Sequence, residues 1–134
     1  LEVAKEAKKR IPNIAFVVVG DGQQFNELKV AVEREKLQDT VYLAGRQSDM
    51  RPYYKDAALT LICSLKEGLA LTAYESLSMG KPVVTSDVGG QAELIDETVG
   101  YSLACPFQFI ELLAWPCCRT RLPTQRCVQP AERE

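Results

Sequence analysis

The sequence has 134 residues, 46% of them hydrophobic, which allows one domain with a core of ordinary size. Sixteen basic and 18 acidic residues give a net charge of −2 without long blocks of one sign, which argues against nucleic acid or anionic lipid as a partner. Histidine is absent, so the commonest general base and metal ligand is missing. The apolar runs are shorter than the roughly 20 residues of a membrane span, and we predict none.

Five cysteines are present, and four of them crowd the last thirty residues: Cys105, Cys117, Cys118 and Cys127. Cys63 lies in an apolar run. Without histidine or a CxxC pair, a zinc site would need four irregularly spaced thiols. We therefore expect that no metal is bound, that the thiols are free, and that the protein lies in a reducing, cytoplasmic compartment.

Apolar β-branched runs alternate with amphipathic segments from the first residue to Leu103. In chain order the pattern predicts a helix over 1–10, a strand over 14–19, a helix over 24–36, a strand over 41–44, a helix over 49–55, a strand over 59–63, a helix over 71–79, a strand over 82–86, a helix over 91–95 and a strand over 101–103. Continuous apolar strands are typical of parallel sheets that are covered on both faces. The predicted fold class is therefore α/β, a Rossmann-like parallel sheet with helices on both faces.

The character of the chain changes after residue 103. Residues 104–134 hold four of the seven prolines as well as the four clustered cysteines. They continue no periodic unit, so we predict one α/β domain over 1–103 and an irregular Cys/Pro-rich tail, native or not, over 104–134.

Six glycines follow predicted strands or precede predicted helices: Gly20, Gly22, Gly45, Gly68, Gly89 and Gly90. This is the edge at which open parallel sheets bind ligands. Gly80 is predicted to end a helix, and Gly100 is predicted to have a structural rather than a ligand-binding role. The GDG run at 20–22 fits a phosphate loop and a tight turn equally well. Helical spacing places Met50, Tyr53 and Tyr54 in the core rather than on a stacking platform.

The segment KEGLALTAYESLSMGKPVV carries two acids eight positions apart, Glu67 and Glu75. On one helix they would lie about 80° and about 12 Å apart, which is poor geometry for an acid/base pair. We instead expect Glu67 and Gly68 in a loop, a helix that begins near residues 70–72, and Glu75 one turn inside it.

The free N–H groups of that first turn, from residues 69–71, suit a phosphate group. Carboxylates beside a phosphate would bind neutral sugar hydroxyls, so the geometry suits a nucleoside diphosphate sugar. Acids in a first helical turn are also favoured by the helix dipole alone, so the spacing leaves a purely structural role open.

Residues 1–103 resemble the C-terminal, donor-binding half of retaining glycosyltransferases of the GT-B architecture, family 4, often called group 1. Three segments carry the resemblance: PNIAFVVVGDG; VYLAG followed by YYKDAAL; and SLKEGLALTAYESLSMGKPVVTSDVGGQAELI. The third contains the family's E-x7-E signature at Glu67 and Glu75, and a Gly-Gly-x-x-Glu turn that ends at Glu93.

The resemblance implies transfer of a hexose from a UDP- or GDP-linked donor, with retention and without a cofactor or obligatory metal. It implies that Glu67, the catalytic candidate, holds donor-sugar hydroxyls, while Glu75 holds the ribose hydroxyls. Backbone amides of Gly68, Leu69, Ala70 and Leu71 would contact sugar and phosphates, and Thr72 would add a hydroxyl. Gly45 and Arg46 would border the base.

The sequence departs from the family pattern in three respects. Ala70 stands where glycine is common and would add a methyl group near the phosphates. The family's central first strand, with an Arg and a Lys-Gly that neutralise the diphosphate, is not found, and Lys5, Lys8 and Lys9 lie on a solvent-facing helix. The tail also replaces further family helices.

These departures imply a fragment without its acceptor-binding N-terminal domain, and an isolated chain that is inactive. Without the first strand of the order 3-2-1-4-5-6, a strand-exchanged dimer would be one way to fill the gap. The alternative function is a non-catalytic nucleotide-binding fragment or interaction module. A nucleotide-sugar epimerase is a third, which the E-x7-E signature and the lack of histidine oppose.

Overall fold

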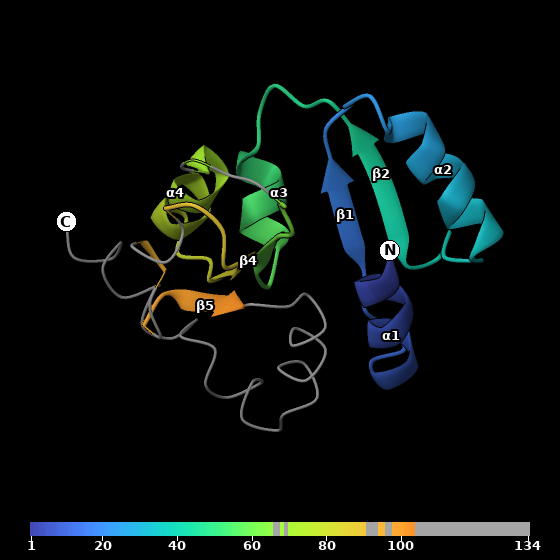
Figure 1. Ribbon diagram of the computed structural model, residues 1–134, viewed down its shortest axis with the longest axis horizontal. Coiled ribbons are helices and arrows are strands. Elements are labelled where there is room, and N and C mark those ends of the chain that lie inside the picture. The colour runs from blue at the N-terminus through green and yellow to red at the C-terminus, as the bar shows by residue number, and fades with distance from the viewer. Residues whose placement is uncertain (66–67, 69, 91–93, 96–97, 104–134) are drawn as a thin grey trace. The chain divides into compact units, whose positions relative to one another are not determined.

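The computed structural model describes residues 1–65, 68, 70–90, 94–95 and 98–103. The chain divides into two compact units, Leu1–Asp49 and Met50–Glu134, and each contains both helices and strands (Figure 1).

The first unit contains two helices and two parallel strands: α1 (Glu2–Arg10), β1 (Phe16–Val19), α2 (Phe25–Arg34) and β2 (Val41–Gly45). One face of the strand pair packs against both helices. The buried cluster there joins Ala4 of α1 and Val32 of α2 to Val41 of β2, with Phe16 and Val18 of β1 packed against it. The alternation of side chains along a strand places these residues on one face.

The opposite face of this strand pair is open among the described residues. Val17 and Tyr42 are partners in the parallel register, and their exposed fractions are 52% and 51%. In the first unit, α1 and α2 both pack against the face that carries Phe16 and Val41, whereas Val17 and Tyr42 lie on the other face.

The second unit contains α3 (Arg51–Asp56), β3 (Thr60–Ile62), α4 (Leu71–Ser78), β4 (Val83–Ser86) and β5 (Gly100–Leu103). β4 is paired in parallel with β3 on one side and β5 on the other. Val83, Val84 and Thr85 are all buried, so this strand is covered on both faces as predicted. Ala73 of α4 packs against Ile62 and Val83, which fixes the helix on the sheet.

The strand orders are β1-β2 in one sheet and β3-β4-β5 in the other. These are the two groups that the expected order 3-2-1-4-5-6 leaves when its first strand is omitted. The fold class is confirmed as α/β, with helices flanking parallel sheets. The predicted helix over 91–95 lies mostly outside the described residues. The tail over 104–134, with its four cysteines, lies wholly outside them.

Helix α4 ends as the sequence predicts. Gly80 has a φ of +69°, its N–H donates to the Leu77 carbonyl at 2.9 Å, and the Lys81 N–H donates to the Ser76 carbonyl at 2.9 Å. This pair of bonds is the Schellman arrangement, in which glycine adopts the left-handed conformation without a Cβ penalty.

Gly100 offers a test of the β4-β5 pairing. A Cβ atom at this position would lie 1.9 Å from the carbonyl oxygen of Val83, whereas a Cβ at Gly22 would meet nothing within 4 Å. We expect Gly100→Ala to lower the free energy of unfolding by about 3 kcal/mol, because backbone has to move, and Gly22→Ala to change it by less than about 1 kcal/mol. Urea denaturation followed by circular dichroism measures the free energy of unfolding of both variants. Equal values would contradict the close approach of Gly100 to Val83.

Candidate functional site

Two glycine-containing loops meet at the carboxyl ends of β3 and β4. The Ser86 hydroxyl donates to the Ser64 carbonyl at 2.6 Å, and the Gly90 N–H donates to the Gly68 carbonyl at 3.1 Å. Gly89 has a φ of +61°, which lets the chain turn sharply before Gly90. The structure thus brings Gly68 and the Gly89-Gly90 turn together, as expected for the ligand-binding edge of a parallel sheet.

Helix α4 begins beside this edge. Ala70 is its N-cap, with an extended backbone, and no side-chain hydrogen bond caps the helix. The Ala73 N–H donates to the Ala70 carbonyl at 2.9 Å, so helix geometry leaves the N–H groups of Leu71 and Thr72 at the open end. Both side chains are exposed. The positive end of the helix dipole therefore lies where the sequence analysis expects a phosphate.

The side chain of Ala70 does not face that open end. Ala70 is 5% exposed and belongs to the buried cluster with Ile62, Ala73, Val83 and Ile95. Its methyl group therefore packs in the core rather than in the space where the sequence analysis placed it. We expect only the backbone of Ala70 to reach a ligand.

Glu75 lies one turn inside α4 and is exposed. Its Oε2 accepts a hydrogen bond of 2.9 Å from the phenol of Tyr54, which is 5% exposed on α3. The same phenol lies 3.5 Å from the Thr72 carbonyl. Burial and the bonded Glu75 carboxylate raise the pKa of Tyr54 to about 12, so its hydroxyl is a donor at neutral pH.

Sequence reasoning placed Tyr54 in the core correctly but missed its contact with Glu75. No spacing rule joins two residues on different helices, so the sequence carried no signal for this pair.

A buried hydroxyl fastens α4 to its neighbours. Ser76 is fully buried, and its Oγ bonds to Thr60 Oγ1 at 2.8 Å and to the Lys81 carbonyl at 3.1 Å. These bonds link the helix to β3 and to the turn before β4. The position of Glu75, the preceding residue, depends on this anchorage.

Of the remaining predicted site residues, Glu67 and Leu69 lie outside the described residues, as does Glu93. Gly45 and Arg46 belong to the first unit. Gly45 ends β2 with a φ of +65°, and its carbonyl accepts the Gly20 N–H at 2.8 Å, so these two edge glycines are neighbours. Arg46 is exposed.

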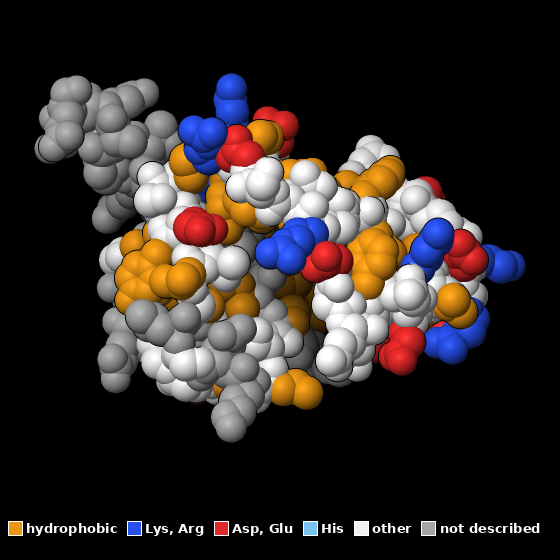
Figure 2. Space-filling view, turned by 90° about the horizontal axis from the view of Figure 1, so that it is seen from above, with side chains coloured by type: hydrophobic (Ala, Val, Ile, Leu, Met, Phe, Trp, Pro, Cys, Tyr) orange, Lys and Arg blue, Asp and Glu red, His pale blue; other side chains and the backbone are white. Residues whose placement is uncertain are grey.

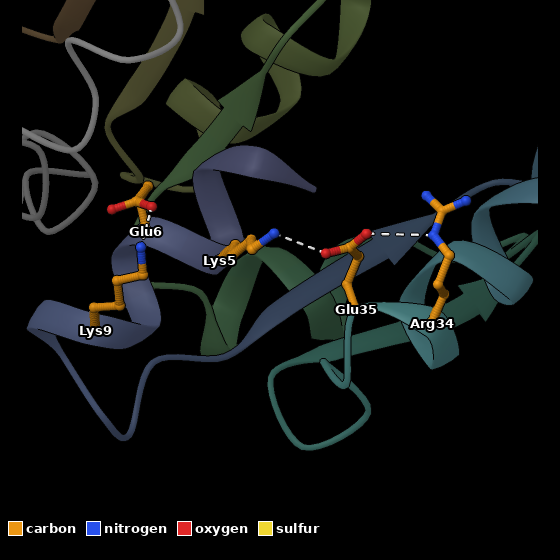
Figure 3. A network of polar contacts seen from close by, with 5 residues as sticks. All are labelled: Lys5, Glu6, Lys9, Arg34 and Glu35. Carbon is orange, nitrogen blue, oxygen red and sulfur yellow. Dashed lines mark hydrogen bonds and ion pairs between the residues drawn. The ribbon is translucent and has the colours of Figure 1, made fainter.

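The lysines of α1 are paired with acids of the first unit. Lys5 contacts Glu35 at 2.7 Å and Lys9 pairs with Glu6 (Figure 3). Lys8 contacts Asp39 at 2.6 Å. The Lys5 bond lowers the pKa of Glu35, and the Lys8 bond lowers the pKa of Asp39. Lys9 is exposed, as expected, whereas Lys5 and Lys8 are half-buried, and all three positive charges are balanced by these acids.

Charged side chains of both signs stand beside one another on the face drawn in Figure 2. Within the described ranges, no group of three or more His, Cys, Asp or Glu residues is placed to hold a metal ion. In the same part of the chain, no helix is long and apolar enough to cross a membrane.

The sequence matches the family model described as glycosyl transferases group 1 over residues 1–114. The chain belongs to this family. The match includes β3, α4, β4 and the Gly89-Gly90 turn, so the edge of β3 and β4 lies within the segment shared with this family.

Individual relatives agree with this assignment. The chain is 34% identical over 83 residues to an uncharacterized glycosyltransferase of Methanocaldococcus jannaschii, covering 62% of this chain and 20% of that protein. It is 36% identical over 95 residues to the poly(glycerol-phosphate) alpha-glucosyltransferase of Bacillus subtilis, covering 69% of this chain and 14% of that protein.

A solved structure, that of the pneumococcal O-GlcNAc transferase GtfA in complex with UDP and GlcNAc, superimposes with a TM-score of 0.77 at 25% identity. The superposition covers 98% of this chain and 28% of that one. The chain spans about a fifth or less of the length of the archaeal and Bacillus relatives that it matches.

The anchorage of α4 can be tested at Ser76. We expect Ser76→Ala to lower the free energy of unfolding by about 1–3 kcal/mol, because Thr60 Oγ1 and the Lys81 carbonyl lose a buried partner. Ser78→Ala is the matched control on the same helix, since Ser78 is exposed and its hydroxyl donates to the Glu75 carbonyl at 2.7 Å. Thermal unfolding by calorimetry compares the two; a loss as large in Ser78→Ala would contradict the role given to Ser76.

The Lys5-Glu35 pair predicts a pH dependence of stability. Because the pKa of folded Glu35 lies below its ordinary 4.5, its contribution is complete above pH 4.5 and is lost as the pH falls through the lower folded value. Between pH 7 and pH 3, the stability of Glu35→Gln should therefore fall less than that of the unaltered chain. Denaturation midpoints measured at both pH values compare the two proteins. Glu33→Gln, an exposed neighbour on α2, should behave like the unaltered chain; acid sensitivity unchanged in Glu35→Gln would refute the assignment.

Proposed function

We propose that this chain is the donor-binding part of a retaining glycosyltransferase that transfers a hexose from a nucleoside diphosphate sugar to an acceptor. The observation that carries the proposal is the edge formed by Gly68, the Gly89-Gly90 turn and the open end of α4, with the exposed carboxylate of Glu75 one turn inside. This arrangement lies within the residues matched by the group 1 family.

Charge complementarity assigns the two ends of the donor. The N–H groups of Leu71 and Thr72 and the positive helix end suit the diphosphate. The Glu75 carboxylate would repel a phosphate but accepts hydrogen bonds from two neighbouring hydroxyls, so it suits the ribose. Glu67 would hold hydroxyls of the donor sugar, and amides of residues 68–71 would contact the sugar and phosphates.

The base is proposed from the resemblance and the relatives together. Gly45 and Arg46 would border the base. A uracil nucleotide is the first choice because the pneumococcal relative was solved with UDP, with a guanine nucleotide as the second. No cofactor or obligatory metal is proposed, and the enzyme would work in the cytoplasm.

We further propose that the isolated chain binds its donor without turning it over. Lys5, Lys8 and Lys9 are balanced by acids of the first unit and do not supply the positive charge that the leaving diphosphate needs. The acceptor would be held by a separate N-terminal domain. A purely nucleotide-binding or interaction role is the second candidate, favoured by the small share of each relative that this chain covers.

Calorimetric titration of the full chain with UDP, GDP and ADP tests the donor site. We expect saturable binding of one of them and a weakening of about tenfold to a hundredfold in Glu75→Ala, because a charged hydrogen-bond acceptor is lost. Glu27→Ala is the matched control, since Glu27 is an exposed acid in the first turn of α2.

Absence of binding by all three nucleotides, or equal affinities of the unaltered chain and Glu75→Ala, would overturn the donor-site proposal. Turnover of a nucleotide sugar by the isolated chain would overturn the proposal that it is inactive. Binding without turnover is the expected result.

A further inference from the structure

The contact between Tyr54 and Glu75 joins a buried donor to an exposed acceptor. Tyr54 is 5% exposed on α3, whereas Glu75 lies on the exposed side of α4, and the phenol reaches Glu75 Oε2 at 2.9 Å. Both residues belong to the second unit. The carboxylate is thus held by a buried hydroxyl, while the Glu75 side chain remains exposed to solvent.

The hydrogen bond leaves the carboxylate able to bind a diol. An ionised carboxylate has about four acceptor positions, and the phenol occupies one of them. The free positions on Oε1 and Oε2 can accept two neighbouring hydroxyls. A Glu side chain has several rotatable bonds, and fixing them before a ligand arrives removes part of the entropy lost on binding.

Tyr54 itself is too buried to contact a ligand directly. Its phenol is the donor and the carboxylate is the acceptor, since its raised pKa keeps the hydroxyl protonated well above neutral pH. Its other polar neighbour, the Thr72 carbonyl at 3.5 Å, belongs to the first turn of the same helix α4. The hydroxyl therefore touches two residues of the proposed donor site without lying in it.

We propose that Tyr54 is a positioning residue whose phenol orients the Glu75 carboxylate for the two ribose hydroxyls of the donor nucleotide. This inference rests on the proposed function, because it assigns a second residue to the ribose end of the same site. A merely structural role predicts that loss of the hydroxyl affects stability alone. The positioning role predicts an effect that depends on the ribose hydroxyls.

The decisive experiment uses the full chain and two probes, UDP and its 2′,3′-dideoxy analogue. Tyr54→Phe removes the hydroxyl and keeps the ring. We expect it to weaken UDP binding by about three- to tenfold and to leave binding of the dideoxy analogue unchanged. Tyr53→Phe, at the neighbouring half-buried tyrosine of α3, should change neither affinity.

A double variant sharpens the result. In the Glu75→Ala background, Tyr54→Phe should produce no further loss of UDP affinity, because the two residues act as one unit. Unchanged UDP affinity in Tyr54→Phe, or equal weakening of both probes, would overturn the inference while the proposed function stands. If the unaltered chain binds no nucleotide, the proposed function falls and this inference falls with it.

The contact itself has a readout that needs no change at Tyr54. Ultraviolet titration follows the five tyrosines of the chain as their phenols lose protons. In Glu75→Gln one phenol should titrate at lower pH than in the unaltered chain, because the negative charge beside Tyr54 is gone. Identical titration curves would show that the phenol does not meet Glu75, which would also overturn the inference.

Discussion

The parallel pairing of β4 between β3 and β5 is the constraint on which the candidate site depends. Parallel strands end at the same edge, so the chain segments that follow β3 and β4 must leave the sheet side by side. The Ser86-Ser64 and Gly90-Gly68 hydrogen bonds tie these segments together. With Ser76 anchoring α4 to β3, the open end of the helix and Glu75 are held at that edge.

In the proposed donor site, electrostatics accounts for acids beside a positive helix end. A helix end attracts an anion, while a carboxylate near it repels one unless it is occupied by hydroxyls. A nucleoside diphosphate sugar meets both demands because its diols flank its phosphates. The lysines of α1 take no part in this balance, since each is already paired with Glu35, Asp39 or Glu6.

Several predictions from the sequence were confirmed because their signals are local. The left-handed Gly80 that ends α4 is an example, since glycine followed by Lys-Pro stops a helix wherever it stands. The start of α4 near residue 71 and the burial of Val83 and Val84 followed from periodicity in the same way. The exposure of Val17 and Tyr42 was not predicted, because an apolar run does not reveal which of its residues a helix covers.

The amino-acid sequence by itself determined the α/β class, the alternation of elements and the family, because hydrophobic period, turn residues and the E-x7-E spacing are all properties of neighbours along the chain. Only the tertiary structure decided that the Ala70 methyl group packs in the core and that Tyr54 bonds to Glu75. Those contacts depend on how α3, α4 and the sheet pack in space. Packing joins residues 21 positions apart, a separation over which no sequence pattern repeats.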